Sequence, residues 1–307
     1  MKKFLLLAAI LCAPLALVAQ NETKEDTIPN GWSRSGNISL LFNQAAFNHE
    51  WTGGGSSNIA GNIGLNYDFN YKHDKLSWNN RIIAEYGMTK NKDDKYARKT
   101  NDRLELNSIL GRQVKESNWY YSFFLNFKTQ FGSGYEYNTD LNPGDEGYRT
   151  EVSKFMSPGY LQFGPGMMWK KNNNLYVNLA PATARLIFVN KDFTNVGNNP
   201  VAIAAFNENP YFGVEANETT RFEFGASVSA YAKLDLMENV SMENLLALYS
   251  NYLEDPQNVD VDYTMNLLFK VNKYISANAT FQAIYDDNAA QGFQIREAIG
   301  VGVTYGF

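Results

Sequence analysis

The last fourteen residues of the chain, Gln294 to Phe307, alternate between two kinds of side chain and end on an aromatic residue. The apolar set is Ile295, Ile299, Val301, Val303, Tyr305 and Phe307. The positions between them, from Arg296 to Gly306, are mostly small or polar. Because successive side chains of a β-strand point to opposite faces, this pattern predicts one long strand with an apolar face and a polar face.

Eleven further segments alternate in the same way, and no helical periodicity of comparable quality competes with them. The twelve predicted strands cover 37–43, 58–71, 78–89, 103–112, 119–131, 159–170, 175–188, 221–236, 240–252, 260–271, 274–285 and 294–307. Tight connections (72–75, 114–118, 171–174, 237–239, 272–273) alternate with looser ones (44–56, 90–102, 132–158, 189–220, 253–258, 286–293). Bacterial transmembrane barrels show this asymmetry, with short periplasmic turns and longer extracellular loops.

A soluble β-sandwich or lipocalin-like barrel would also alternate, and three features weigh against it. The long strands exceed the roughly 5–6 residues usual in soluble proteins and match the roughly 9–11 that a tilted membrane strand needs. A closed twelve-stranded barrel with its apolar face inward would enclose more space than those side chains fill. Aromatic residues also gather at strand ends, as in interfacial girdles; they are Tyr71, Trp78, Trp119, Trp169 and Tyr305.

We therefore expect an all-β fold: a transmembrane antiparallel up-and-down β-barrel of about 12 strands over residues 37–307. Its C-terminal strand resembles the signal by which outer-membrane barrels are recognised for insertion, with Tyr305 and Phe307 as the aromatic residues of that signal. Residues 1–20 are predicted to be a signal peptide, because a basic start precedes a short apolar stretch. Residues 21–36 then form a short periplasmic N-terminal segment.

Charge and cysteine content narrow the class of protein further. The chain has one cysteine, Cys12, inside the predicted signal peptide, so the mature fold is expected to need no disulfide. Removing Lys2 and Lys3 changes the formal net charge from -5 to -7. The absence of a basic block excludes nucleic acid as an expected partner. After residue 20 no run of about eighteen apolar residues could form a spanning helix.

The charged residues of the strands are predicted to face the lumen, because a lysine or arginine on the lipid face at mid-membrane costs about 2–4 kcal/mol. The candidate lumen-lining residues are Arg81, Glu85, Arg103, Glu105, Lys128, Glu223, Asp260, Asp262, Lys270 and Arg296. Arg81 with Glu85 and Arg103 with Glu105 place opposite charges on one inward face. Such pairs either close a barrel or line a wet, selective pore. Pro165 and Pro181 are each expected to mark a bulge or bend.

Several stretches together resemble one known family. They are GW at 31–32, FNQAAFNHEWTGGGSS at 42–57, LSWNN at 76–80, LAPATARLIFV at 179–189 and VNKYISANATFQAIYDDN at 271–288. The resemblance is to the domain of unknown function 3078 (DUF3078) family of Bacteroidota outer-membrane β-barrel proteins. It implies a barrel in the outer membrane of a Gram-negative bacterium and supplies no catalytic residues. His49 and Glu50 stand before Trp51, where the family pattern has an asparagine directly before the tryptophan.

The first outer loop holds the main candidate for catalysis. A histidine beside a carboxylate, as in His49-Glu50, could act as a base in a hydrolase, but no serine or aspartate constellation converges on it in the sequence. The alternative is a loop in which Gly53, Gly54 and Gly55 make a sharp reversal and Trp51 packs at the rim. His73 is expected to be a solvated turn residue. The acidic residues of the loops match no calcium-loop spacing, so we expect no bound metal. We also expect no cofactor and no enzymatic activity.

The polar inward face favours a narrow pore or a binding barrel for small polar solutes, which the long loops 132–158 and 189–220 could constrict. The alternative is a structural or partner-binding envelope barrel with a plugged lumen. An outer-membrane hydrolase using His49 is a third, weaker hypothesis. The expected partners are outer-membrane lipid, the barrel assembly machinery during insertion, and a small polar solute.

Overall fold

The structure is a computed structural model, and it describes residues 30–47, 57–92, 94–290 and 292–307. The chain divides into two units, Met1–Asn30 and Gly31–Phe307, and nearly all described residues belong to the second. The predicted signal peptide, most of the predicted N-terminal segment, and the first-loop residues His49, Trp51, Gly53, Gly54 and Gly55 lie outside the described residues.

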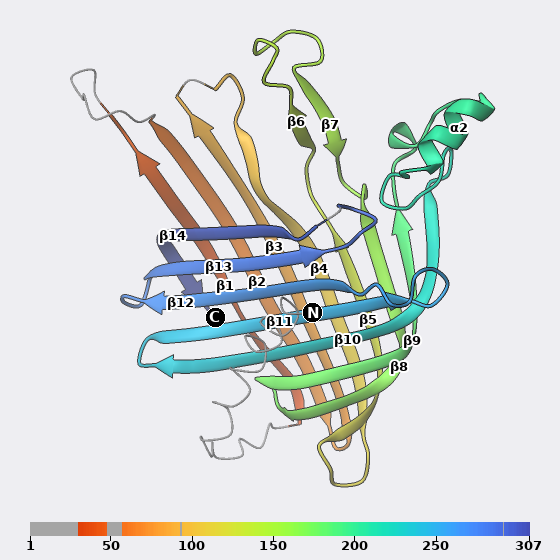
Figure 1. Ribbon diagram of the computed structural model, residues 1–307. Coiled ribbons are helices and arrows are strands. Elements are labelled where there is room, and N and C mark those ends of the chain that lie inside the picture. Colours follow the sequence, from red (N-terminus) through yellow and green to blue (C-terminus); the bar gives the residue numbers. More distant parts are fainter. Residues whose placement is uncertain (1–29, 48–56, 93, 291) are drawn as a thin grey trace, which may run out of the picture. The chain divides into compact units, whose positions relative to one another are not determined.

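Twelve antiparallel strands close into one barrel, as the alternation predicted (Figure 1). They are β1 (Gly31–Ala45), β2 (Asn58–His73), β3 (Leu76–Asn91), β4 (Arg98–Gln113), β5 (Trp119–Thr129), β8 (Gly159–Asn172), β9 (Leu175–Phe188), β10 (Thr220–Met237), β11 (Val240–Asn251), β12 (Asp260–Lys270), β13 (Ile275–Tyr285) and β14 (Gln294–Gly306). Each strand pairs with its neighbours in the chain, and β1 pairs with β14 to complete the ring. β1 begins at Gly31, earlier than the predicted residue 37.

Tight turns and long connections alternate around the barrel, and we call its two rims the turn end and the loop end. Two long loops carry structure of their own that the sequence did not predict. A small hairpin of β6 (Gly134–Tyr137) and β7 (Arg149–Ser153) stands in one. The other contains the 3-10 helix η2 (Lys191–Phe193) and the helix α2 (Pro200–Asn207). No helix in the described residues is long and apolar enough to cross a bilayer.

The two predicted proline irregularities are confirmed. The β8–β9 register shifts between Phe163 and Met167, a stretch that includes Pro165 and faces Pro181. Neither proline can donate a ladder hydrogen bond, so the strands bend here instead of pairing. Gly166 lies in the same stretch, and a Cβ there would collide with the backbone carbonyl of Leu179. The bend therefore depends on a residue without a side chain.

The outward face of the barrel is apolar over nearly its whole height. Its exposed side chains include Ile38, Leu40, Phe42, Ile63, Leu110, Phe123, Phe222, Ile295, Val301 and Val303. At the turn end the Trp32 ring lies 5.2 Å from that of Tyr71 and 5.7 Å from that of Trp78. Trp119 is paired in register with Trp169. So continuous an apolar surface is unfavourable in water. It suits the hydrocarbon core of a membrane, with the aromatic girdle at the membrane interface.

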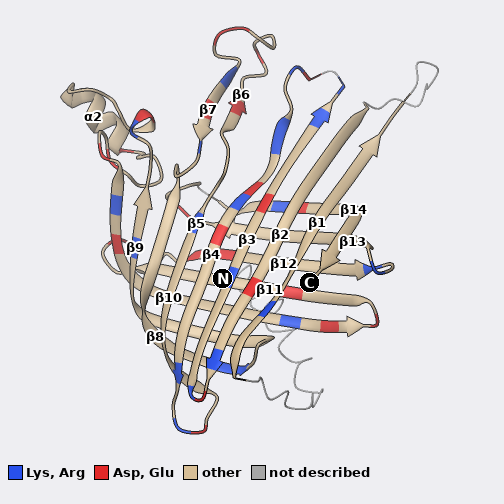
Figure 2. Ribbon diagram, turned by 180° about the vertical axis from the view of Figure 1, so that it is seen from behind, with Lys and Arg blue, Asp and Glu red and all other residues tan. Residues whose placement is uncertain are grey.

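The inward face combines a small apolar core with charged side chains. Ile109, Phe124, Met168 and Ala180 form a buried cluster inside the barrel, against which Tyr120 and Tyr176 pack. In Figure 1 the strands β10–β13 run steeply across β2–β5, so the two walls of the barrel cross each other. Charged positions lie in the connections at both rims and along the strands between them (Figure 2).

Candidate functional site in the barrel lumen

The structure places nearly all of the predicted lumen residues on inward positions of their strands, and most are buried or half-buried. Lys270 differs, because it is exposed at the turn end of β12. Arg103, Glu105 and Glu223 are almost completely buried. The ion pairs and hydrogen bonds of these charged side chains show how each charge is paired.

A first bridge crosses the lumen from β3. The Arg81 guanidinium donates to both carboxylate oxygens of Asp68 on β2, at 2.7 and 3.0 Å. It also donates to the Tyr231 hydroxyl at 3.1 Å, and this hydroxyl donates to Glu243 at 2.8 Å. The strands β4, β5, β8 and β9 separate β3 from β10, so the contact joins nearly opposite walls. We call this set the lower bridge, because it lies nearer the turn end.

Arg81 pairs with Asp68 of the neighbouring strand and not with Glu85 of its own strand. Four residues along one strand span about 13 Å, whereas the cross-strand neighbour Asp68 stands directly opposite Arg81 in the β2–β3 register. Glu85 instead accepts a hydrogen bond from Asn101 at 2.9 Å and lies 3.8 Å from Arg296 of β14.

A second bridge crosses the lumen near the loop end. Lys128 of β5 forms an ion pair with Asp262 of β12, and β8 to β11 lie between these two strands. Gln282 donates a second hydrogen bond to Asp262 at 3.1 Å. The predicted Arg103–Glu105 pair is present beside this upper bridge. A two-residue separation is short enough for these long side chains to meet on one face.

A buried triad of Arg185, Glu223 and Asp260 joins β9, β10 and β12. Arg185 lies 2.5 Å from Glu223 and 2.6 Å from Asp260, and Arg221 lies 2.9 Å from Glu223. Glu223 has no exposed surface. Sequence reasoning found the two acids and missed Arg185, because the bulge beside Pro181 changes which residues of β9 face inward. Arg185 stands directly opposite Glu223 in the β9–β10 register, and this pairing is the signal that would have identified Arg185 as a lumen residue.

The larger of two lumenal cavities has a volume of about 510 Å³, within the range of small-molecule sites. Residues of both bridges line it, including Arg81 with Tyr231 and Lys128 with Asp262. The cavity is therefore a chamber between the two bridges. Its other lining side chains are aliphatic, aromatic and uncharged polar groups, together with six more charged ones: Asp102, Arg103, Glu105, Arg185, Asp260 and Asp286. The Tyr249 hydroxyl is buried and has no hydrogen-bond partner within the described part of the chain.

The two long loops meet at the rim of this chamber, where Pro158 and Phe212 join its lining. The Tyr211 hydroxyl donates to the carbonyl of Val152 at 2.7 Å, and Lys154 forms an ion pair with Asp192 at 2.6 Å. Only the bases of the loops constrict the lumen, because the β6–β7 hairpin projects away from the barrel (Figure 1).

The rim also holds a group of carboxylates. Oxygens of Asp260, Asp286 and Asp287 lie within 4.8 Å of one another, although Asp260 already pairs with Arg185. Burial raises the pKa of the Asp286 carboxyl, while Arg185 and the backbone N–H of Asn288 oppose that rise. These carboxylates could attract a cation, but their geometry alone does not define a metal site. His73 lies in an exposed turn beside Asp74, at 3.5 Å.

Residues 42–135 match the model of a protein family described as "protein of unknown function (DUF3078)". This match agrees with the resemblance to the DUF3078 family and covers under a third of the chain. The matched part runs from the end of β1 through β5 to β6 and includes Arg81, Arg103 and Lys128. No curated protein matches the sequence.

Solved outer-membrane barrels resemble the fold of this protein at low identity. The translocator domain of autotransporter NalP from Neisseria meningitidis is 9% identical with a TM-score of 0.37, over 99% of this chain and 97% of that one. An outer membrane channel from Pseudomonas putida F1 is 10% identical with a TM-score of 0.37, over 93% and 99%. Outer membrane phospholipase A from Escherichia coli is 10% identical with a TM-score of 0.33, over 93% and 94%. Such low similarity assigns no activity.

The outward apolar band and the aromatic girdle identify this barrel as an outer-membrane protein, since bacterial barrels of this kind span that membrane. Its lumen contains a chamber held between two cross-lumen bridges. The first outer loop, where His49 was the candidate base, lies outside the described residues.

Proposed function

We propose that this barrel binds a small polar solute in its larger chamber and passes it slowly between the loop end and the turn end. The observation that supports this proposal is the chamber of about 510 Å³ between the upper and lower bridges. Both bridges are made of side chains alone, Lys128 with Asp262 and Arg81 with Tyr231 and Glu243. Rotamer changes can therefore open either one without moving a strand.

Planar-bilayer recordings of the full-length protein test the proposal. The native barrel is expected to show small conductance steps, because both bridges obstruct the lumen. Lys128→Ala and Arg81→Ala each remove one obstruction, and the double variant is expected to conduct severalfold more than either single variant. Lys115→Ala is the matched control, because Lys115 is exposed in the turn between β4 and β5 and should leave conductance unchanged.

Two results would count against transport. If native protein and double variant both fail to conduct, although they show the heat-dependent gel shift of a folded barrel, the pore is abandoned. If Lys115→Ala changes conductance as much as Arg81→Ala does, the bridges are not the obstruction.

The second candidate is a structural or partner-binding barrel with a closed lumen. The bonds that fasten the two long loops together favour it, because they present a fixed surface at the loop end. A stoichiometric partner captured from membranes, together with a non-conducting double variant, would support this alternative.

The remaining parts of the proposal concern location and chemistry. We place the protein in a Gram-negative outer membrane, inserted by the barrel assembly machinery, and we assign it no enzymatic activity. His49→Ala is accordingly expected to leave the lipid composition of the envelope unchanged. A change in that composition would revive the hydrolase hypothesis.

A further inference from the structure

The seam where the first and last strands meet is only partly paired. β1 and β14 are in register from Asn37 opposite Gly306 to Phe42 opposite Val301. On its other side, β1 pairs with β2 along its whole length. Within the described residues, the stretch of β14 from Gln294 to Gly300 has a partner on β13 but none on β1. We call this stretch the open edge.

The open edge lies where a barrel wall would normally be sealed. Its residues belong to the loop-end half of β14, and its outward side chains Ile295 and Ile299 are 64% and 76% exposed. Unpaired backbone groups are tolerated at membrane depth only where they line a polar cavity or are otherwise covered. An edge that leaves several backbone groups without a strand partner is therefore expected to have something polar beside it.

A carboxylate stands on the outward face of this edge. Glu297 occupies the outward position between Ile295 and Ile299, and it is exposed. A charged group on the lipid face is unfavourable unless water or an opposite charge reaches it. Glu297 thus marks a place on the outer wall that suits a cation.

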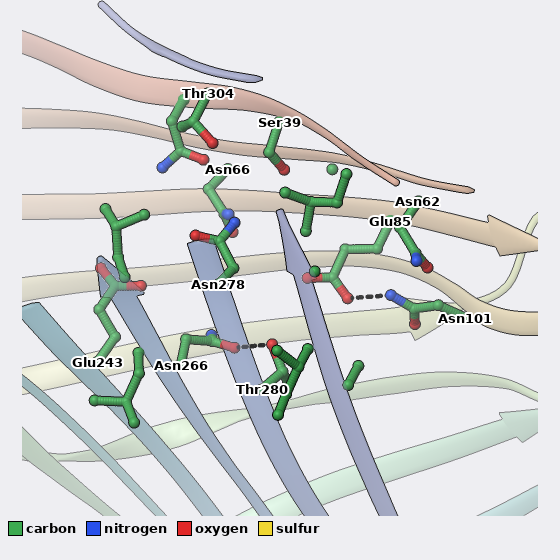
Figure 3. A pocket seen from close by; sticks show the side chains of 18 of the residues that line it. Ser39, Asn62, Asn66, Glu85, Asn101, Glu243, Asn266, Asn278, Thr280 and Thr304 are labelled. Atoms are coloured by element: carbon green, nitrogen blue, oxygen red, sulfur yellow. Dashed lines mark hydrogen bonds between the residues drawn. The ribbon is translucent and has the colours of Figure 1, made fainter. Parts of the chain in front are cut away.

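The smaller lumenal cavity, about 160 Å³, is lined in part by the open edge. Ala298, Ile299 and Gly300 of the open edge form part of its wall, and Leu41 of β1 forms another part. The cavity lies between the β1–β3 wall and the β11–β14 wall, whose polar side chains face each other across it (Figure 3). These include Ser39, Asn62, Asn66, Glu85, Asn266, Asn278 and Arg296.

One polar group inside this cavity lacks a partner. The Asn278 side-chain oxygen is buried and accepts no hydrogen bond from the described residues. Asn278 stands on β13 in register with Gly300 of the open edge. An acceptor at this position is suited to an N–H donor that arrives through the seam.

We propose that the open edge is a lateral entry through which the headgroup of an ethanolamine phospholipid reaches the smaller cavity. Its ammonium group forms an ion pair with the carboxylate of Glu297 on entry. Inside the cavity it donates a hydrogen bond to the side-chain oxygen of Asn278. Arg296 of the open edge also lines the cavity, 3.8 Å from Glu85, and is placed to meet the phosphate. The acyl chains stay outside against Ile295 and Ile299, since the cavity is of headgroup size.

Disulfide trapping tests whether the edge is open. In a Cys12→Ser background, Leu40→Cys with Val303→Cys places two outward cysteines in register within the paired part of the seam. Gln44→Cys with Ile299→Cys places two outward cysteines where the same register would continue. The first pair is expected to oxidise readily, because cross-strand distances suit a disulfide, and the second severalfold less. Equal oxidation of both pairs would overturn the lateral entry.

Photocrosslinking in nanodiscs tests the ligand. A photoreactive amino acid at Thr280 lines the smaller cavity, whereas one at Gln282, the next inward position of β13, does not. Phosphatidylethanolamine nanodiscs are expected to give lipid adducts at Thr280 severalfold above those at Gln282. The Glu297→Gln variant should lose most of that excess.

Two further arms separate the lipid from other ligands. Free phosphoethanolamine should not compete with the adducts, because the headgroup arrives from the membrane; full competition would show a soluble ligand and overturn the lipid assignment. Phosphatidylglycerol nanodiscs should give adducts only at the background of Gln282. Equal adducts from both lipids would overturn the role of the ammonium group.

Discussion

The two sides of the barrel are held together by different interactions. Where β3–β5 face β9–β12, charged side chains meet in the lumen through the two bridges and the Arg185 triad. At the β1–β14 seam, closure rests on backbone pairing over Asn37–Phe42, with two further bonds between Gly36 and Phe307. One side of the barrel is therefore stabilised by side chains that meet in the lumen, whereas the seam is stabilised by backbone hydrogen bonds between its two strands.

The largest expected effect concerns the buried triad. Glu223→Ala leaves Arg185 and Arg221 facing each other without their shared carboxylate, and breaking a buried pair costs about 3–5 kcal/mol. Guanidinium unfolding in detergent measures the loss. The exposed pair of Lys154 with Asp192 is the control, where Asp192→Ala should cost about 0–1 kcal/mol. Comparable losses at the two sites would show that burial does not set the strength of these charge pairs.

A second prediction addresses the seam itself. A Cβ at Gly302 would collide with the backbone carbonyl of Leu40, so Gly302→Ala should strain the paired part and cost about 1–3 kcal/mol. Ala298→Val adds volume in the open edge, where no β1 strand opposes it, and is expected to be nearly neutral. The same unfolding measurement checks both variants. Equal costs would indicate that the seam is sealed along its whole length.

A third, smaller effect is expected at the loops. Tyr211→Phe removes the hydrogen bond to Val152 and should cost about 0.5–1.5 kcal/mol. Limited proteolysis is the more sensitive measurement, since cleavage within 132–158 should accelerate while the strands stay intact. Unchanged cleavage would mean that the other contacts, such as the Lys154–Asp192 pair and the hydrogen bond from the Asn190 backbone N–H to the Ser157 hydroxyl, suffice to fasten the two loops.

The smallest effect is a pH dependence at the rim. Burial raises the pKa of Asp286 above its ordinary value, so the folded protein binds this proton more tightly than the unfolded chain does. Stability from this group is therefore greatest at low pH and falls as pH rises from the unfolded pKa, about 3.9, through the raised value. Asp286→Asn should remove that fall. Unfolding midpoints of both proteins across the acidic range would show it, and parallel curves would contradict it.

The alternation of apolar and polar residues predicted the strands, because this period of two follows from the local geometry of a strand and does not depend on distant contacts. The loop structures escaped prediction because β6 and β7 are short, although Asn199 before Pro200 is a helix-start signal that marks α2. Arg103–Glu105 was predictable from spacing along one strand. The lower bridge was not, since Arg81 and Tyr231 meet only because the closed wall brings opposite strands within reach.

The lumen bridges carry a consequence for the order of assembly. Arg81 and Tyr231 are 150 residues apart in the chain, and Lys128 and Asp262 are 134 apart. Contacts of such long range cannot form until the ring is almost complete. Replacing either cation is accordingly expected to accelerate unfolding while leaving the rate of folding nearly unchanged, because these side chains meet after the transition state has passed.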